Sequence, residues 1–131
     1  MPVTSDSAAV IAAIDHVQAW SNHDFDAARA ALSEQVKVIA ITTQPIMKPT
    51  DLVGIDDYMV GLTEFARAVV PGSAHIVSSM GDDDNALLTL TVEADFGTGP
   101  MTLPASRLYL FDGRGKIRAE QVIFFATPAQ S

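Results

Sequence analysis

Apolar residues recur at helical spacing in the first half of the chain and alternate with polar residues in the second half. Val10, Ile11, Ile14 and Val17 fall on one half of a helical wheel, and serine and aspartate residues that can cap a helix precede them. This pattern predicts a first helix over roughly residues 6–21.

A second helix and a strand are predicted next along the chain. Asp24 can cap a short helix that runs through Phe25 and Ala28 to Leu32. The run over residues 36–43 is rich in Val, Ile and Thr, which favours a strand.

A third helix follows a loop that contains Pro45, Pro49 and Gly54. The apolar positions of this helix recur at helical spacing and are Ile55, Tyr58, Met59, Leu62, Phe65 and Val69. Pro71 and Gly72 end it, because proline cannot continue a helix.

The remainder of the chain is predicted to form strands joined by turns rich in glycine and aspartate. The strands cover residues 74–80, 86–95, 101–111 and 116–126. Helices followed by a meander of strands are typical of an α+β domain with its helices on one face of a curved antiparallel sheet. The length of 131 residues suits a single domain over residues 1–131.

Composition and charge exclude several classes of function. The chain is 48% hydrophobic and 18% charged, which predicts a folded rather than a disordered protein. Its net charge of −8 repels phosphate backbones and anionic lipids, so neither nucleic acid nor a membrane is an expected partner. No signal peptide or membrane span is recognisable, and a cytoplasmic location is the default expectation.

Metal and thiol chemistry are also not expected. The chain has no cysteine, so disulfides and thiolate nucleophiles are excluded. His16, His23 and His75 show no close metal-ligand spacing. No metal and no cofactor are predicted.

The last hairpin contains a pair of opposite charges. If Gly113 and Arg114 are the two central turn residues, Arg107 faces Glu120 across the strands. Two interpretations are open at this point. The pair is either an exposed ion pair contributing well under about 1 kcal/mol or the polar floor of a pocket.

Three segments of the sequence carry a resemblance to a known superfamily. They are Trp20–Asp26, Gly54 with Ile55, and Phe111–Ile117. The chain resembles the nuclear transport factor two-like superfamily, which includes SnoaL-like polyketide cyclases, ketosteroid isomerases and limonene epoxide hydrolases. The resemblance implies a cone-shaped curved antiparallel β-sheet wrapped around three N-terminal helices, also described as a cystatin-like roll, with an apolar pocket inside.

The resemblance also indicates which residues face that pocket. His16 stands where the isomerases carry a tyrosine, but Ala40 and Arg107 replace their two aspartates, which disfavours isomerase chemistry of that kind. The epoxide hydrolase pattern of an arginine and two aspartates is absent as well. The candidate catalytic residues are His16, Arg107 and Glu120. The candidate substrate-binding residues are Trp20, Tyr58, Tyr109, Val122 and Phe124.

Strand alternation sorts the sheet residues into two faces. The face expected inside the cone carries Leu87, Thr89, Thr91, Glu93, Ala105, Arg107, Tyr109, Glu120, Val122 and Phe124. The more apolar face carries Leu88, Leu90, Val92, Ser106, Leu108, Leu110, Ala119, Gln121, Ile123 and Phe125. Left outside, the second face would promote aggregation unless covered, so a homodimer through it is expected. A β-bulge would reverse this assignment.

Two functions remain open on the sequence. The first is a SnoaL-like enzyme with a pocket for a small, mostly apolar oxygenated molecule, working by cofactor-independent acid/base catalysis of the cyclase, isomerase or hydrolase type. Here Arg107 binds an oxyanion, His16 or Glu120 moves the proton, and Glu120 has a lowered pKa beside Arg107. The alternative is a non-catalytic dimeric protein that binds a small ligand in the same pocket.

Overall fold

The computed structural model describes the backbone of residues 7–42 and 50–124, and the side chains of these residues except at 40–42, 50–51 and 124. In chain order the elements are α1 (Ala8–Ser21), α2 (Phe25–Ala30), β1 (Leu32–Thr42), β2 (Thr50–Val53), α3 (Ile55–Arg67), β3 (His75–Gly81), β4 (Asn85–Asp95), β5 (Pro100–Phe111) and β6 (Ile117–Phe124). The predicted loop residues Pro45 and Pro49 lie outside the described residues.

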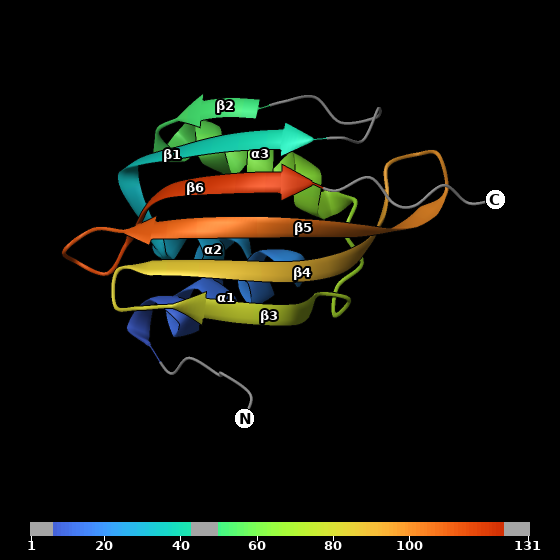
Figure 1. Ribbon diagram of the computed structural model, residues 1–131. Coiled ribbons are helices and arrows are strands. Elements are labelled where there is room, and N and C mark those ends of the chain that lie inside the picture. The colour runs from blue at the N-terminus through green and yellow to red at the C-terminus, as the bar shows by residue number, and fades with distance from the viewer. Residues whose placement is uncertain (1–6, 43–49, 125–131) are drawn as a thin grey trace.

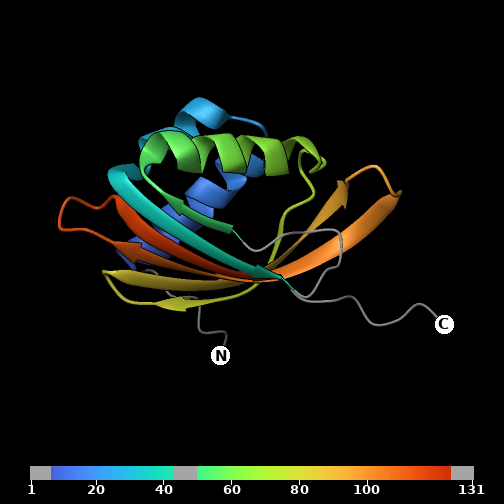
Figure 2. The same cartoon turned by 90° about the horizontal axis from the view of Figure 1, so that it is seen from above.

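The strands form one curved, open sheet whose concave face is covered by the helices (Figures 1 and 2). The strand order is β2-β1-β6-β5-β4-β3. All neighbouring pairs are antiparallel except β1 with β6, which is parallel. The predicted α+β class is therefore confirmed, and the parallel pair is a correction to the all-antiparallel expectation. It arises because the first strand, which pairs with β2 on one side, pairs with the last strand of the chain on the other.

Several elements in the first half differ from the prediction, and α3, for example, ends at Arg67 instead of continuing through Val69. Helix α2 ends at Ala30, and Leu32 is the first residue of β1 rather than the last of the helix. Backbone pairing of Ile117 with the carbonyl of Ala31, at 2.9 Å, draws the chain into the sheet at this point. The predicted loop also contains a short strand, β2, because Thr50–Val53 pairs with β1.

The register of the last hairpin differs by two residues from the predicted one. Glu120 pairs with Tyr109, and Arg107 pairs with Val122. The connection is longer than a two-residue turn, with Asp112 N–H donating to the Lys116 carbonyl at 2.8 Å. A slip of two residues keeps every side chain on its face, because side chains alternate with period two. Arg107 and Glu120 are therefore still on the same side of the sheet.

The predicted facing of β4 is wrong. Leu88 pairs with Arg107 and Leu90 with Ala105, so these leucines face the helices. The four-residue connection over 96–99 pairs odd-numbered with even-numbered residues, whereas the prediction placed odd-numbered residues of both strands together. Alternation determines which residues of one strand share a face, but the length of the turn determines which residues of the next strand lie on that same face. The outer face is thus less apolar than expected.

Candidate functional site

An ion pair lies in the core between the sheet and the helices. Arg107 of β5 donates from Nη1 to Oε2 of Glu120 on β6 at 2.9 Å. The side chains are 4% and 2% exposed, so the exposed-pair interpretation is wrong. Glu120 is two residues from Val122, the direct partner of Arg107, so the two side chains meet diagonally, which is within reach of long side chains.

Helices α3 and α1 add two polar groups to this pair. The Tyr58 hydroxyl donates to Oε1 of Glu120 at 2.5 Å, so both carboxylate oxygens are engaged. Tyr58 stands in the first turn of α3, where its backbone N–H binds the carbonyl of Gly54 at 3.0 Å. The His16 ring lies between Tyr58 and Ala28. Its Nε2 atom is 3.3 Å from the Tyr58 hydroxyl oxygen, and its Nδ1 atom is 3.1 Å from the Ala28 carbonyl oxygen. The buried polar cluster is therefore His16, Tyr58, Arg107 and Glu120.

Aromatic side chains surround the guanidinium group. The Cζ atom of Arg107 lies 4.7 Å from the centroid of the Trp20 ring and 5.6 Å from that of Phe65. Tyr109 packs edge-on against His16, with ring centroids 5.7 Å apart. The positive charge thus contacts aromatic faces, which stabilise cations. The helical spacing predicts Phe65 only as an apolar position of the third helix and does not indicate its contact with Arg107.

The charges of the cluster fix its protonation. Burial alone would raise the pKa of Glu120, but the charge of Arg107 and the hydroxyl groups of Tyr109 and Tyr58 lower it below its ordinary value. Burial would lower the pKa of Arg107, yet the Glu120 charge raises it. Burial and the same carboxylate raise the pKa of both tyrosines. At neutral pH Glu120 is an anion, as predicted, and both hydroxyl groups keep their hydrogens.

His16 is neutral at pH 7. Burial lowers its pKa to about 4, and the charge of Arg107 adds to this, while Glu120 and the Ala28 carbonyl oppose it. A neutral imidazole accepts a proton but does not supply one. This narrows the predicted role of His16 to that of a base in the ligand-free protein.

One buried donor of this region, Nε1 of Trp20, has no hydrogen-bond partner among the described residues, and Trp20 is 0% exposed. Leaving such a group unpaired costs about 1–3 kcal/mol. Of the other predicted contact residues, Val122 is buried opposite Arg107, and the side chain of Phe124 lies outside the described part of the chain.

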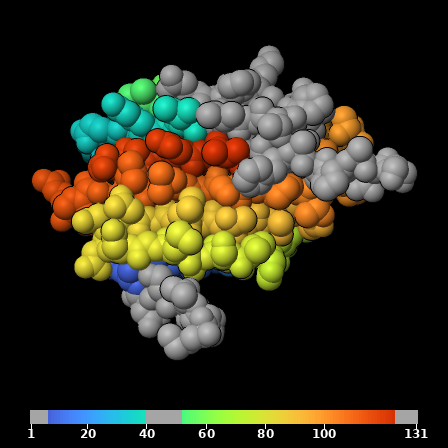
Figure 3. Space-filling model, viewed as in Figure 1, coloured from blue at the N-terminus to red at the C-terminus, as the bar shows by residue number. Residues whose placement is uncertain are grey.

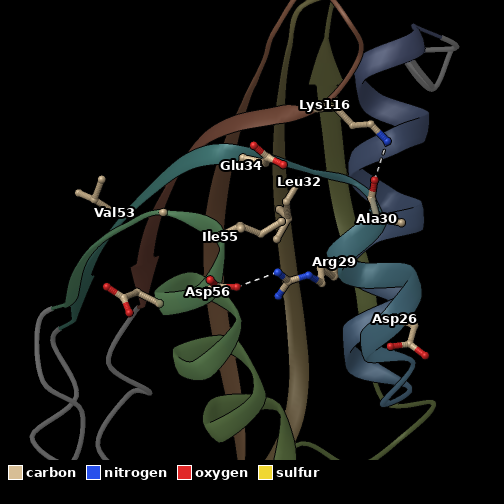
Figure 4. Close-up of a pocket in the computed structure, with 11 residues that line it drawn as sticks. Asp26, Arg29, Ala30, Leu32, Glu34, Val53, Ile55, Asp56 and Lys116 are labelled. Atoms are coloured by element: carbon tan, nitrogen blue, oxygen red, sulfur yellow. Dashed lines mark hydrogen bonds and ion pairs between the residues drawn. The ribbon is translucent and has the colours of Figure 1, made fainter.

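A separate groove of about 890 Å³ opens on the surface beside the start of β1 (Figure 4). None of the sequence-predicted site residues lines it. Both of its basic side chains have partners: Arg29 pairs with Asp56 at 2.7 Å, and Lys116 donates to the Ala30 carbonyl at 2.6 Å. The groove is therefore a solvated surface feature with mixed charge.

Over the described residues, no group of three His, Asp or Glu side chains could hold a metal ion. Within the same residues, no helix is both long and apolar enough to cross a membrane.

The sequence matches a family model, and the fold matches solved structures. Residues 13–120 match the model of the SnoaL-like domain. A crystal structure of a Kribbella flavida DSM 17836 protein is 25% identical, with a TM-score of 0.74 over 89% of this chain and 86% of that one. An NTF2-like protein from Cytophaga hutchinsonii ATCC 33406 is 16% identical, with a TM-score of 0.68 over 93% and 94%.

A third solved structure contains a bound steroid. RV0760c from Mycobacterium tuberculosis, in complex with estradiol-17beta-hemisuccinate, is 15% identical, with a TM-score of 0.72 over 89% of this chain and 93% of that one. None of the curated proteins matches the chain. With the family model covering most of the sequence and the fold shared over nearly its whole length, the chain belongs to the SnoaL-like family of the nuclear transport factor two-like superfamily.

Proposed function

We propose that this protein binds a small, mostly apolar oxygenated molecule beside the Arg107–Glu120 pair and acts on it by cofactor-independent acid/base catalysis. The reaction is of the cyclase, isomerase or hydrolase type. Arg107 stabilises the oxyanion that develops on the substrate, and Glu120 removes a proton as a carboxylate base. Trp20, Tyr58, Tyr109, Val122 and Phe124 shape the binding site.

The observation that carries this proposal is the ionised pair buried in the core. Removing two charges from water costs several kcal/mol each, and well-packed apolar residues often serve stability as well or better. A contribution to folding stability is therefore a weak explanation for the presence of this buried pair. Perturbed carboxylates and bases gathered in one place are instead typical of functional sites.

The unpaired Nε1 of Trp20 indicates the chemistry of the ligand. Trp20 Nε1 can only donate a hydrogen bond, so an acceptor oxygen on the ligand would satisfy it. The surrounding aliphatic and aromatic side chains favour an apolar body for the same molecule. The steroid ester bound by RV0760c, a structural neighbour, has both properties and provides a starting point for a search.

A thermal-shift screen of steroids, polyphenols and small carboxylates tests the binding, and a search for product follows with each stabilising compound. For a converted compound, Glu120→Gln and Arg107→Lys are each expected to lower kcat/KM at least about tenfold, because the base or the fixed guanidinium is lost. Arg114→Ala, at an exposed hairpin position, is the matched control and retains activity. Unchanged turnover in both site variants would remove the pair from the mechanism.

The same screen separates catalysis from simple binding. Compounds that stabilise the protein without being converted would favour the alternative, a non-catalytic ligand-binding or accessory protein. No stabilisation by any of the three classes would argue against a pocket for such molecules.

We also propose that two copies associate through the outer face of the sheet (Figure 3). Exposed apolar side chains on this face are Ile39, Met80, Leu87 and Ile123, with 36–57% of each accessible. Covering them removes apolar surface from water. Sedimentation is expected to give a dimer for the native chain and a monomer for Ile123→Asp. The control Val60→Asp, on an exposed position of α3, keeps the native mass. A monomeric native chain would rule out this association.

A further inference from the structure

The hydrogen-bonding capacities of His16 and Tyr58 do not match when the cluster is neutral. Nδ1 of His16 lies 3.1 Å from the carbonyl oxygen of Ala28, which can only accept, so Nδ1 carries the ring hydrogen. Nε2 of the neutral ring is then an acceptor. It lies 3.3 Å from the Tyr58 oxygen.

Tyr58 has a single hydrogen for two acceptors. Its hydroxyl oxygen is 2.5 Å from the Glu120 carboxylate. The ionised carboxylate can only accept, so the Tyr58 hydroxyl donates its hydrogen to Glu120. Nε2 of His16 and the Tyr58 oxygen therefore face each other with lone pairs. The cluster is one proton short of a complete hydrogen-bond chain from Glu120 to Ala28.

One added proton completes the chain in two ways. If Glu120 is protonated, its O–H donates to the Tyr58 oxygen and the Tyr58 O–H donates to Nε2 of His16. If His16 is protonated instead, Nε2–H donates to the Tyr58 oxygen and Tyr58 donates to the carboxylate. The two forms differ only in the positions of two hydrogens along His16–Tyr58–Glu120.

We propose that Tyr58 relays protons between Glu120 and His16, which makes His16 the proton store for the carboxylate. This inference rests on the proposed acid/base function. When Glu120 takes a proton from the substrate, an O–H bond forms on its carboxyl group. The Tyr58 O–H then breaks as Nε2–H forms, while the Glu120 O–H breaks as a new Tyr58 O–H forms. The carboxylate is regenerated, and the reverse transfer returns the proton to the product.

The packing around the cluster favours this route. His16 is 1% exposed and Tyr58 is 2% exposed, so bulk water has little access to Nε2. The charged and titratable groups that act on the histidine are Arg107 on β5 and Glu120 on β6, with Tyr58 on α3 and Tyr109 on β5 packed against its ring. Of these, Tyr58 is the one within hydrogen-bond distance of the ring nitrogen. Burial disfavours the imidazolium, so the stored proton is readily returned.

The relay is testable without a substrate by ¹⁵N spectra of the histidine rings in the full chain at neutral pH. The native protein is expected to show His16 with its hydrogen on Nδ1. Glu120→Gln imitates the protonated carboxyl group, because its carbonyl faces Arg107 and its amide donates to Tyr58. The Tyr58 hydrogen is then free for His16, and the Nε2 resonance is expected to move upfield.

Two double variants identify the source of that hydrogen. The upfield shift is expected to disappear in Tyr58→Phe/Glu120→Gln and to persist in Tyr109→Phe/Glu120→Gln, which removes the other buried hydroxyl beside the ring. A shift that persists without Tyr58, or no shift in Glu120→Gln, would overturn the relay.

The native spectrum decides even if a variant fails to fold: an Nε2–H tautomer of His16 contradicts the relay and an Nδ1–H tautomer supports it. A failed ligand screen would leave this result standing, so the relay and the proposed function fail separately.

Discussion

Arg107→Met is expected to lower the free energy of unfolding by about 3–5 kcal/mol, because it leaves the Glu120 carboxylate buried without its counter-charge. Methionine retains an unbranched apolar stem but lacks the guanidinium carbon that lies over the rings of Trp20 and Phe65, so the loss includes these cation–π contacts as well as the counter-charge. Urea denaturation provides the measurement, with the slope of unfolding free energy against urea as a check that the denatured state is unchanged.

The matched control is the double variant Arg107→Met/Glu120→Gln. Glutamine removes the unpaired charge but keeps an amide beside the Tyr58 hydroxyl, so most of the lost stability should return. Strict additivity of the two single variants would contradict a direct coupling, because residues in one buried ion pair are expected to show an interaction energy of about 0.5–3 kcal/mol.

The second large effect is on the pH dependence of stability. The pKa of His16 is about 4 in the folded protein and 6.5 in the reference state. Between these values the unfolded chain holds a proton that the folded chain lacks, so the free energy of unfolding falls as the pH falls. The loss over this window is about 3 kcal/mol. The lowered pKa of Glu120 adds a further loss at still lower pH.

His16→Gln removes the titrating group and is expected to flatten the stability curve between pH 6.5 and about 4.5, whatever its stability at pH 7. His75→Gln is the control, since His75 is exposed on β3, and this variant should keep the native slope. Chemical denaturation at a series of pH values measures both. An identical slope in His16→Gln and the native protein would mean that another group causes the acid loss.

Local patterns in the sequence predicted most of the fold. The helices and the four late strands lie close to their expected positions, because periodicity and turn residues act over a few neighbouring residues. The prediction failed for β2, which forms by pairing with β1, and for the end of α2 at Ala30. Both depend on contacts with strands distant along the chain.

In the candidate site, too, local patterns predicted some features, whereas others depend on contacts between distant parts of the chain. Arg107 and Glu120 were found because they are opposite charges on the two strands of one hairpin, and the two-residue error in register did not change their face. Leu88 and Leu90 were placed on the wrong face, because alternation does not carry across a turn of undetermined length. The resemblance to the superfamily provided His16, which spacing alone would not distinguish from a core histidine.

By itself, therefore, the sequence determined the α+β class, the order of elements and the residue types of the polar cluster. Only the tertiary structure decided that Tyr58 meets Glu120 and that His16 meets Tyr58, contacts that span 62 and 42 residues. The ion pair that keeps Glu120 ionised and the burial that keeps His16 neutral were decided there too. The physical reason is that hydrogen bonding and desolvation depend on distances between segments far apart in the chain, which a local pattern does not encode.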